Sequence, residues 1–400
     1  MNSSGGAAEK MEPADLVQLE KDVEAFCQEV RPVEELCYLE HRFNGEAIEL
    51  ARKYNLLGIP VAQEFGGRGA DLAAYLAALV RIGREGSGLR TLFSGHTSIG
   101  QYPIARFGSP DQQRKYLEPS SAGEKIMAFG LTEPEAGSNP LEMQSTYRRE
   151  GDHYLLNGVK YLISNGGIAD TIVLFAYPAE GDSRMSAFIV DTDGPGIERE
   201  DMTAKLGLPT SNTAMFELSD YAVPVENMLG LEGDGFRIAM ETLVSGRLSV
   251  AAGCLGVIED CLEETIQYAK QRKQYGKPIA RHQLVQQHIA RIELARQTTA
   301  SLLATASEAK MTSDLDREDS PRLEHADLLA AEVKFVASNS AFEAADRALQ
   351  VFGGRGYSEL FRPARHWKDV RVCRIYEGTD EILQLKIAAS LLGKDYGAFR

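Results

Sequence analysis

The hydrophobic periodicity of this chain changes twice, and those changes limit the folds open to it. From about residue 13 to 120, apolar residues recur at three- and four-residue spacing, as in "DLVQLEKDVEAFCQEV" and "DLAAYLAALVRIGREG", which predicts amphipathic helices. Near Ile126 this pattern gives way to short β-prone runs such as "TIVLFAY" and "MSAFIVD". After "GLEGDGF" the helical period returns. The sequence predicts a mainly α fold with a β middle domain: a helical domain over 13–125, a β domain over 126–232 and a helical domain over 233–400.

The C-terminal region contains enough helix for a four-helix bundle. One apolar stripe comprises Val285, Ile289, Ile292, Ala295, Leu302 and Ala306, and a second comprises Leu329, Val333, Val336, Ala341, Ala344 and Ala348. Gly353 follows the second stripe as a C-cap. A third helix is expected over 235–271, and a fourth begins near Thr379. The polar insert "TSDLDREDSP" reads as an exposed loop.

In the middle domain, the clearest hairpin candidate is "HYLLNGVKYLIS". Asn157 and Gly158 supply the two positive φ angles of a type I′ turn. We therefore expect a strand over 154–156 to pair with one that begins at Val159.

Composition excludes some classes of partner. The chain has 400 residues, with 58 Asp and Glu against 43 Lys and Arg, for a formal charge of -15. That charge disfavours nucleic acid and anionic membrane surfaces. The five cysteines are scattered and never form CxxC, so we expect no disulfide framework. No apolar run approaches the roughly 20 residues of a membrane span. The start "MNSSGGAAEK" does not read as a secretory signal, so we expect a disordered tail over 1–12 on a cytoplasmic protein.

The usual short catalytic signatures are missing. There is no GxGxxG after a strand, no GxxxxGK[ST], no HExxH and no GxSxG, which removes the main support for a Rossmann site, a P-loop, a zincin or a serine hydrolase. His282 and His288 are six residues apart on a helix and point in different directions, so no metal site is expected.

Three polar, Gly-rich segments remain: "AFGLTEPEAGSNP", "KYLISNGG" and "RKQYGKPIARHQ". The first offers hydroxyls at Thr132 and Ser138 beside flexible glycines, as a cradle for a polar ring or phosphate needs; it also reads as a strand that ends in a turn. The cations of the third are equally explained as complements to a helix dipole. In "RIYEGTDEILQL", Glu377 is either a surface carboxylate before a helix capped by Thr379 or a base.

Taken together, these segments resemble the acyl-CoA dehydrogenase family from about residue 15 to the C-terminus. The matching motifs are "LTEPEAGS", "KYLISNG", "GFRIAM", "RKQYGKPIARHQ", "QVFGGRGY" and "IYEGTDEI", in the family's order. The resemblance implies an N-terminal helical domain, a middle β-barrel-like domain and a C-terminal four-helix bundle. It also implies FAD as cofactor, a homotetramer built as a dimer of dimers, and oxidation of an acyl-CoA to the 2-enoyl-CoA.

Under this resemblance Glu377 is the base that removes the α-proton, while the β-hydrogen leaves as hydride to flavin N5. Gly378 admits the thioester. Some relatives take the base from the position before the Arg of "VSGR", which here is Gly246 and has no side chain. Arg247 matches a residue near the acyl-CoA mouth, although Val244 replaces an Asp often found three residues earlier; Arg247 reads equally as a buried ion-pair partner.

The resemblance also assigns cofactor and substrate contacts. The residues that it assigns to contact the isoalloxazine ring are Phe129, Leu131, Thr132, Leu162 and Ser164. At the position of Leu162 the family often has an aromatic residue. Ser138 matches a residue near the pantetheine. The pyrophosphate and adenosine side comprises Arg272, Gln274, Tyr275, His282, Gln283, Gln350, Gly353 and Gly354, shared with a neighbouring subunit. Thr379 and Glu381 match the last cofactor contacts.

The acyl group and the electron acceptor are less defined. Arg90 falls where the glutaryl-CoA dehydrogenase branch pairs a substrate carboxylate, although it also reads as a surface or helix-capping arginine. An electron-transfer flavoprotein is the expected acceptor. The alternatives are an oxidase or monooxygenase of the same fold, a dehydrogenase acting on a carrier-protein thioester, or an assembly scaffold without catalysis.

Overall fold

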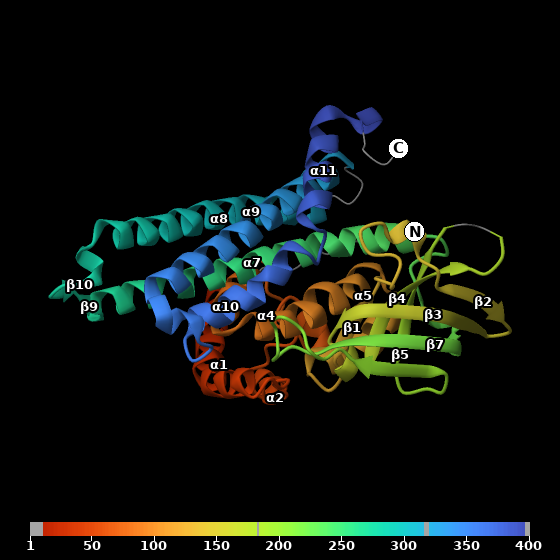
Figure 1. Cartoon of the computed structure of the whole chain (residues 1–400). Coiled ribbons are helices and arrows are strands. Elements are labelled where there is room, and N and C mark those ends of the chain that lie inside the picture. Colours follow the sequence, from red (N-terminus) through yellow and green to blue (C-terminus); the bar gives the residue numbers. More distant parts are fainter. Residues whose placement is uncertain (1–10, 182–183, 316–319, 397–400) are drawn as a thin grey trace.

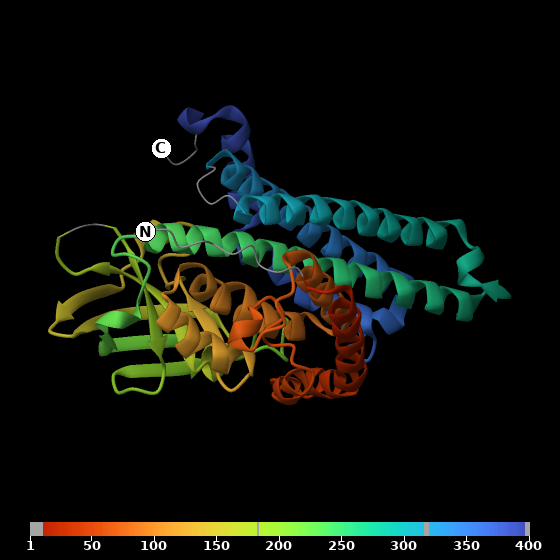
Figure 2. The ribbon, with the colours of Figure 1, turned by 180° about the vertical axis from the view of Figure 1, so that it is seen from behind.

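The N-terminal helices pack between a β domain and a bundle of long helices (Figures 1 and 2). The computed structural model describes residues 11–181, 184–315 and 320–396. The N-terminal helices are α1 (Pro13–Leu39), α2 (Glu46–Lys53), α3 (Leu72–Glu85), α4 (Ser87–Phe93), α5 (Tyr102–Phe107) and α6 (Pro110–Ser121), with a π-helical turn, η2, over Ser94–Gln101. This arrangement of helices, β domain and bundle confirms the predicted fold class. Residues 1–10 of the expected tail lie outside the described residues.

The middle domain is one sheet of eight strands. They are β1 (Met127–Gly130), β2 (Thr146–Glu150), β3 (His153–Ser164), β4 (Thr171–Pro178), β5 (Ser186–Asp191), β6 (Ile197–Asp201), β7 (Thr213–Pro224) and β8 (Met228–Leu229). The strand order is β6-β7-β3-β2-β4-β5-β8, and β1 pairs with β4 in parallel. The predicted runs "TIVLFAY" and "MSAFIVD" thus form the neighbouring strands β4 and β5.

The hairpin predicted at Asn157 and Gly158 is wrong, because β3 continues through both residues. The chain reverses earlier, between β2 and β3, where Gly151 has φ 64°. Asn157 instead accepts a 2.9 Å hydrogen bond from the backbone of Asp220 on β7, beside a register shift. A Cβ on Gly158 would lie 2.2 Å from Oγ of Ser145. The close approach of Ser145, just before β2, and the positive φ of 145° together explain this glycine.

The C-terminal domain contains α7 (Gly235–Gln271), α8 (Gln283–Leu315), α9 (Ser320–Phe352), α10 (Arg362–Val370) and α11 (Asp380–Leu392). The first three run side by side, and α11 packs on α9 (Figure 1). The predicted loop "TSDLDREDSP" is wrong in part, because Thr312–Leu315 continue α8; its residues 316–319 lie outside the described residues. The helical hydrogen bonds of that turn outweigh the polar composition of the segment.

Helix α7 is the centre of the molecule. It is long and apolar enough to cross a bilayer by length and composition, but 89% of its apolar window is buried inside the protein. Glycines bring α3 close to it, since a Cβ on Gly83 would lie 2.9 Å from the carbonyl oxygen of Gly253. One apolar core includes residues of α1, α3, α7 and α9. The N-terminal helices and the bundle are therefore packed as one body around α7.

Candidate active site

Glu377 lies in a strained turn between the short helix η8 (Arg371–Arg374) and α11. Its φ is 55° and that of Gly378 is 97°, so both residues are in the left-handed region, which a glutamate seldom adopts. Thr379 ends the turn and caps α11, as predicted, because its hydroxyl accepts from the backbone N–H of Ile382 at 3.3 Å. A strained non-glycine residue beside a helix cap is typical of a functional site.

The carboxylate of Glu377 points into the protein. Oε2 is buried and has no hydrogen-bond partner within the described chain. A Cβ added to Gly246 would lie 2.5 Å from Oε2 of Glu377. Positions 246 and 377, the two candidate positions for the base, are therefore next to each other in space. Burial raises the pKa of Glu377 to about 7, against opposing contributions from Arg247, Lys334 and Arg90. Such a carboxyl group titrates near neutral pH, as suits a general base.

Arg247 contacts the same turn from α7. Its side chain is buried, its Nε donates to the carbonyl oxygen of Glu377 at 3.3 Å, and its Nη1 pairs with Asp327 at 2.7 Å. A cavity of about 170 Å³ adjoins this pair. Met240, Val244 and Asp327 line it, so the valine that replaces an expected aspartate presents an apolar wall here.

Arg90 lies in the core, which makes the surface interpretation of this arginine wrong. It is 2% exposed and packs over Gly253, two helical turns along α7 from Gly246. Its guanidinium donates to the hydroxyls of Tyr376 and of Ser94, the latter at 3.0 Å. Among the described residues it forms no ion pair. A buried guanidinium without a carboxylate is a candidate site for an anionic group.

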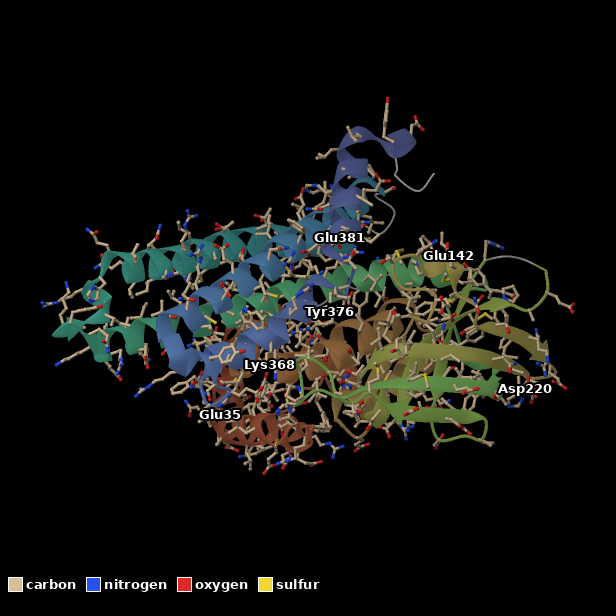
Figure 3. All side chains as sticks on the ribbon, viewed as in Figure 1. Glu35, Glu142, Asp220, Lys368, Tyr376 and Glu381 are labelled. Atoms are coloured by element: carbon tan, nitrogen blue, oxygen red, sulfur yellow. The ribbon has the colours of Figure 1, made fainter. Side chains whose placement is uncertain are left out.

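Sequence reasoning missed several residues around the turn. The hydroxyl of Tyr376 lies 3.1 Å from Sγ of Cys373 as well as beside Arg90, near the middle of the molecule (Figure 3). Lys334 of α9 donates to the carbonyl oxygen of Gly378 at 2.6 Å. The sequence feature that could have pointed to Lys334 is its position as a single cation on an Ala-rich helix face. No local signal marked Tyr376 apart from its place in "YEGT".

The residues assigned to the flavin ring lie on β1, in the loop that follows it, and on β3, which runs beside them. Phe129 and Leu131 are buried, and the carbonyl oxygen of Thr132 accepts from the backbone of Tyr161 on β3 at 2.9 Å. The hydroxyls of Thr132 and Ser164 form no hydrogen bond within the described chain. Two unpaired hydroxyls beside apolar side chains fit the edge and face of a polar ring such as a flavin.

This cradle has structural features that the sequence did not indicate. Glu133 and Lys160 form an ion pair of 2.7 Å, with both side chains buried; burial lowers the pKa of Lys160 to about 8. Leu162 has φ 60° and is 52% exposed, so its irregular backbone presents an apolar side chain at the surface. A Cβ on Gly95, one residue beyond Ser94, would lie 3.5 Å from that of Ser164. The segment that carries Arg90 therefore also reaches the cradle.

The adenosine-side residues lie elsewhere in the chain. Arg272, Gln274 and Tyr275 occupy the short hairpin of β9 (Lys273–Gln274) and β10 (Lys277–Pro278). This hairpin is at the end of the bundle far from the β domain (Figures 1 and 2). The remaining members are at the same end, near the start of α8 or the end of α9: His282, Gln283, Gln350, Gly353 and Gly354. One chain therefore does not bring the two halves of the predicted cofactor site together.

Two further predicted contacts are exposed. Ser138 lies in the loop after β1, and Glu381 is in the first turn of α11 (Figure 3). Neither contacts the carboxylate of Glu377 through a hydrogen bond in the described chain. The residues that the structure describes include no group of three or more His, Cys, Asp or Glu side chains able to hold a metal.

The three-domain fold, with a β domain between two helical domains along the chain, holds a buried carboxylate at Glu377 and hydroxyls at Thr132 and Ser164 that are unpaired in the described chain. Three family models match the chain, namely the acyl-CoA dehydrogenase N-terminal domain over 13–124, middle domain over 128–221 and C-terminal domain over 233–392. The chain belongs to the acyl-CoA dehydrogenase family.

Individual proteins agree with this assignment. An acyl-CoA dehydrogenase of Bacillus subtilis (strain 168) is 38% identical over 94% of this chain and 98% of its own. The structure of butyryl-CoA dehydrogenase from Megasphaera elsdenii matches with a TM-score of 0.88 and 32% identity, covering 96% of this chain and 99% of that one. A glutaryl-CoA dehydrogenase in complex with glutaryl-CoA matches with a TM-score of 0.87 and 32% identity, covering 96% of each chain.

Proposed function

We propose that this protein is an FAD-dependent acyl-CoA dehydrogenase that oxidises the α,β bond of an acyl-CoA to the 2-enoyl-CoA, with Glu377 as the base. The observation that carries the proposal is the Glu377 carboxylate, which is buried over Gly246 with a pKa near 7. Bound FAD supplies the acceptor for the β-hydrogen, which leaves with its electron pair as hydride; similar solved structures contain FAD or its reduced form.

The chain's own residues prepare the proton transfer. Oε2 of Glu377 has no hydrogen-bond partner among the described residues, so it is free to accept the α-proton. Burial keeps water from solvating the carboxylate and outweighs the three nearby cations, which strengthens the carboxylate as a base. Gly378 leaves the approach to the carboxylate open because it has no side chain. Phe129, Leu131, Thr132, Leu162 and Ser164 would hold the flavin ring.

Anaerobic mixing of the purified protein with a panel of acyl-CoA thioesters tests the proposal. We expect at least one thioester to bleach the flavin absorbance, with the 2-enoyl-CoA as product. If none does, the protein is not an acyl-CoA dehydrogenase. Rapid reoxidation by air after bleaching would indicate an oxidase. Bleaching only by carrier-protein thioesters would indicate a dehydrogenase that acts on a carrier-protein thioester.

The rate of flavin reduction should depend on pH. Because only the ionised carboxylate accepts a proton and its pKa is about 7, the rate should rise as pH increases through 7 and level off above 8. Stopped-flow absorbance between pH 5.5 and 9 measures this acid limb. A rate that is constant over this range would contradict the assignment of Glu377 as a base with a raised pKa.

For the acyl group, we propose a thioester whose far end carries a carboxylate, paired with Arg90. The support is the burial of this guanidinium without an ion-pair partner in the described chain, and the similarity to a glutaryl-CoA dehydrogenase. Arg90→Met should lower kcat/KM for glutaryl-CoA on the order of 100-fold more than for butyryl-CoA, as for loss of one partner of a buried charge pair.

The ratio of the two kcat/KM values is the measurement that decides this point. Arg84→Met is the control, since Arg84 pairs with Glu263 at the surface and its loss should leave the ratio unchanged. An equal loss on both thioesters in Arg90→Met would assign Arg90 a structural role.

We also propose a homotetramer, cytoplasmic location and electron transfer to an electron-transfer flavoprotein. The separation of the two predicted cofactor halves supports assembly, as do the exposed leucines Leu284, Leu294, Leu391 and Leu392. The five free, buried cysteines suit a reducing compartment. One similar structure is described as the electron-transferring flavoprotein of Acidaminococcus fermentans. Light scattering tests the assembly, and a dye-linked assay with added flavoprotein tests the acceptor.

A further inference from the structure

One lysine interrupts an otherwise small and apolar face of α9. Lys334 lies between Ala330 and Ala337, and none of the three has any exposed surface. A buried ammonium group is costly unless the protein satisfies it. Lys334 forms no ion pair in the described chain, and it donates to the carbonyl oxygen of Gly378 at 2.6 Å. The only group that it holds by a hydrogen bond there is therefore the turn that carries Glu377.

That turn requires support from outside. Both Glu377 and Gly378 have positive φ, and such strain persists only where neighbouring elements impose it. Helix α9 supports the turn at two points: Lys334 binds the carbonyl oxygen of Gly378, and Asn339 donates at 3.1 Å to Oδ2 of Asp380, the first residue of α11. Arg374 closes the turn by donating to the same oxygen at 2.6 Å. Of these three supports, Lys334 alone bonds a backbone carbonyl of the turn, that of Gly378, the residue after the base.

We propose that Lys334 is a positioning residue for the base: by binding the Gly378 carbonyl it holds Glu377 in the left-handed conformation that directs its carboxylate over Gly246. This inference rests on the proposed role of Glu377. Arg247 binds the preceding carbonyl, that of Glu377 itself, at 3.3 Å. Two cations from two helices thus hold consecutive carbonyls of one turn.

The ammonium group also acts on the charge of the base. Lys334 lowers the pKa of Glu377 in opposition to burial, as do Arg247 and Arg90. Burial in turn lowers the pKa of Lys334 itself. The groups facing Lys334 are Cys373 of η8, Glu377 of the turn, Asp380 of α11 and Cys254 of α7. Removal of the cation should therefore raise the pKa of Glu377, in addition to loosening the turn.

The test uses Lys334→Met in the FAD-loaded enzyme with the thioester that bleaches the wild type fastest. We expect the acid limb of flavin reduction to move to higher pH by about one unit, the typical effect of one nearby charge. We also expect the plateau rate above this limb to fall by at least about tenfold, because the base is less well placed.

Two control variants separate charge from position. Asn339→Ala removes a neutral support, so it should lower the plateau rate without moving the limb. Lys205→Met removes a different lysine, which is partly buried and binds the carbonyl of Ser211 in the loop before β7; it should change neither quantity. If Lys334→Met does not fold, Lys334→Arg replaces it. We then expect the acid limb of flavin reduction to stay near pH 7 and the plateau rate to be lower than that of the wild type. A wild-type plateau in Lys334→Arg would then overturn the inference.

A second measurement does not depend on turnover. The pKa of Glu377 is raised on folding, so its contribution to stability is present below about pH 4.5 and is lost as pH rises through about 7. The difference in Tm between each parent and its Glu377→Gln derivative, followed against pH, isolates this loss. In the Lys334→Met background the loss should extend to higher pH. An unchanged curve would contradict the electrostatic part.

The outcomes distinguish this inference from the proposed function. If no thioester reduces the wild type, or if Glu377→Gln is reduced normally, the proposed function has failed. If the wild type is reduced and Glu377→Gln is not, while Lys334→Met matches the wild type in plateau and limb, only the role of Lys334 has failed.

Discussion

Glu377→Gln is expected to slow flavin reduction by a thioester roughly 10²–10⁴-fold, the usual contribution of a general base. Glutamine has nearly the same shape, so the turn and its contacts should persist while the proton acceptor is lost. The variant should remain yellow and should still bind the 2-enoyl product. Anaerobic stopped-flow at pH 8, where the wild-type carboxylate is ionised, gives the comparison directly.

Glu343→Gln is the matched control, because this glutamate of α9 is exposed and pairs with Arg347 at the surface. Its reduction rate should stay close to that of the wild type. If Glu377→Gln were reduced within a few-fold of the wild-type rate, the base would have to be another group. The pH limb near 7 should disappear with Glu377, which provides an independent check.

Gly246→Ala should have the second largest effect, a loss of about 100-fold in the reduction rate. The added methyl group would lie 2.5 Å from Oε2 of Glu377 and 2.6 Å from its Cδ, so the carboxylate must move. Displacement of a reacting group by about 1 Å is enough for a loss of this size. Stopped-flow reduction with the same thioester measures it.

Gly45→Ala serves as the control glycine, since its Cβ would have 3.8 Å of clearance from Phe43. A wild-type rate in Gly246→Ala would show that the carboxylate does not react from this place. The paired change Gly246→Glu with Glu377→Gly moves the carboxylate from the turn to α7. It should recover part of the activity lost in Glu377→Gly alone, because both positions reach one point in space.

Much of the fold was predictable because periodicity reports a local property. The helix expected over 235–271 is α7, Gly235–Gln271, since its apolar pattern and the Gly-rich segment before it are both encoded nearby. The turn at Asn157 failed for the opposite reason. Asn-Gly is a good local turn signal, but contacts with Ser145 and Asp220, distant in sequence, hold this pair in an extended strand.

The residues of the site also divide into those that local sequence predicted and those that depend on contacts between distant parts of the chain. The motif around Glu377 was sufficient to propose a base, and Gly246 removed the rival on α7. Sequence left open whether Glu377 was a solvated carboxylate, because a pKa depends on groups that surround it in space. Arg90 of α4 and Lys334 of α9 reach the turn and its neighbour Tyr376 from distant parts of the chain, and no spacing in the sequence indicates these contacts.

Residues that are neighbours along the chain were enough to predict the order and type of the domains and the family motifs, and these motifs were enough to propose Glu377 as the base. Only the tertiary structure decided that the carboxylate is buried over Gly246, that Arg90 lies in the core without an ion pair in the described chain, and that Lys334 holds the turn. Burial and electrostatic fields sum over all atoms nearby, whatever their distance in sequence, so they exist only once the helices have packed.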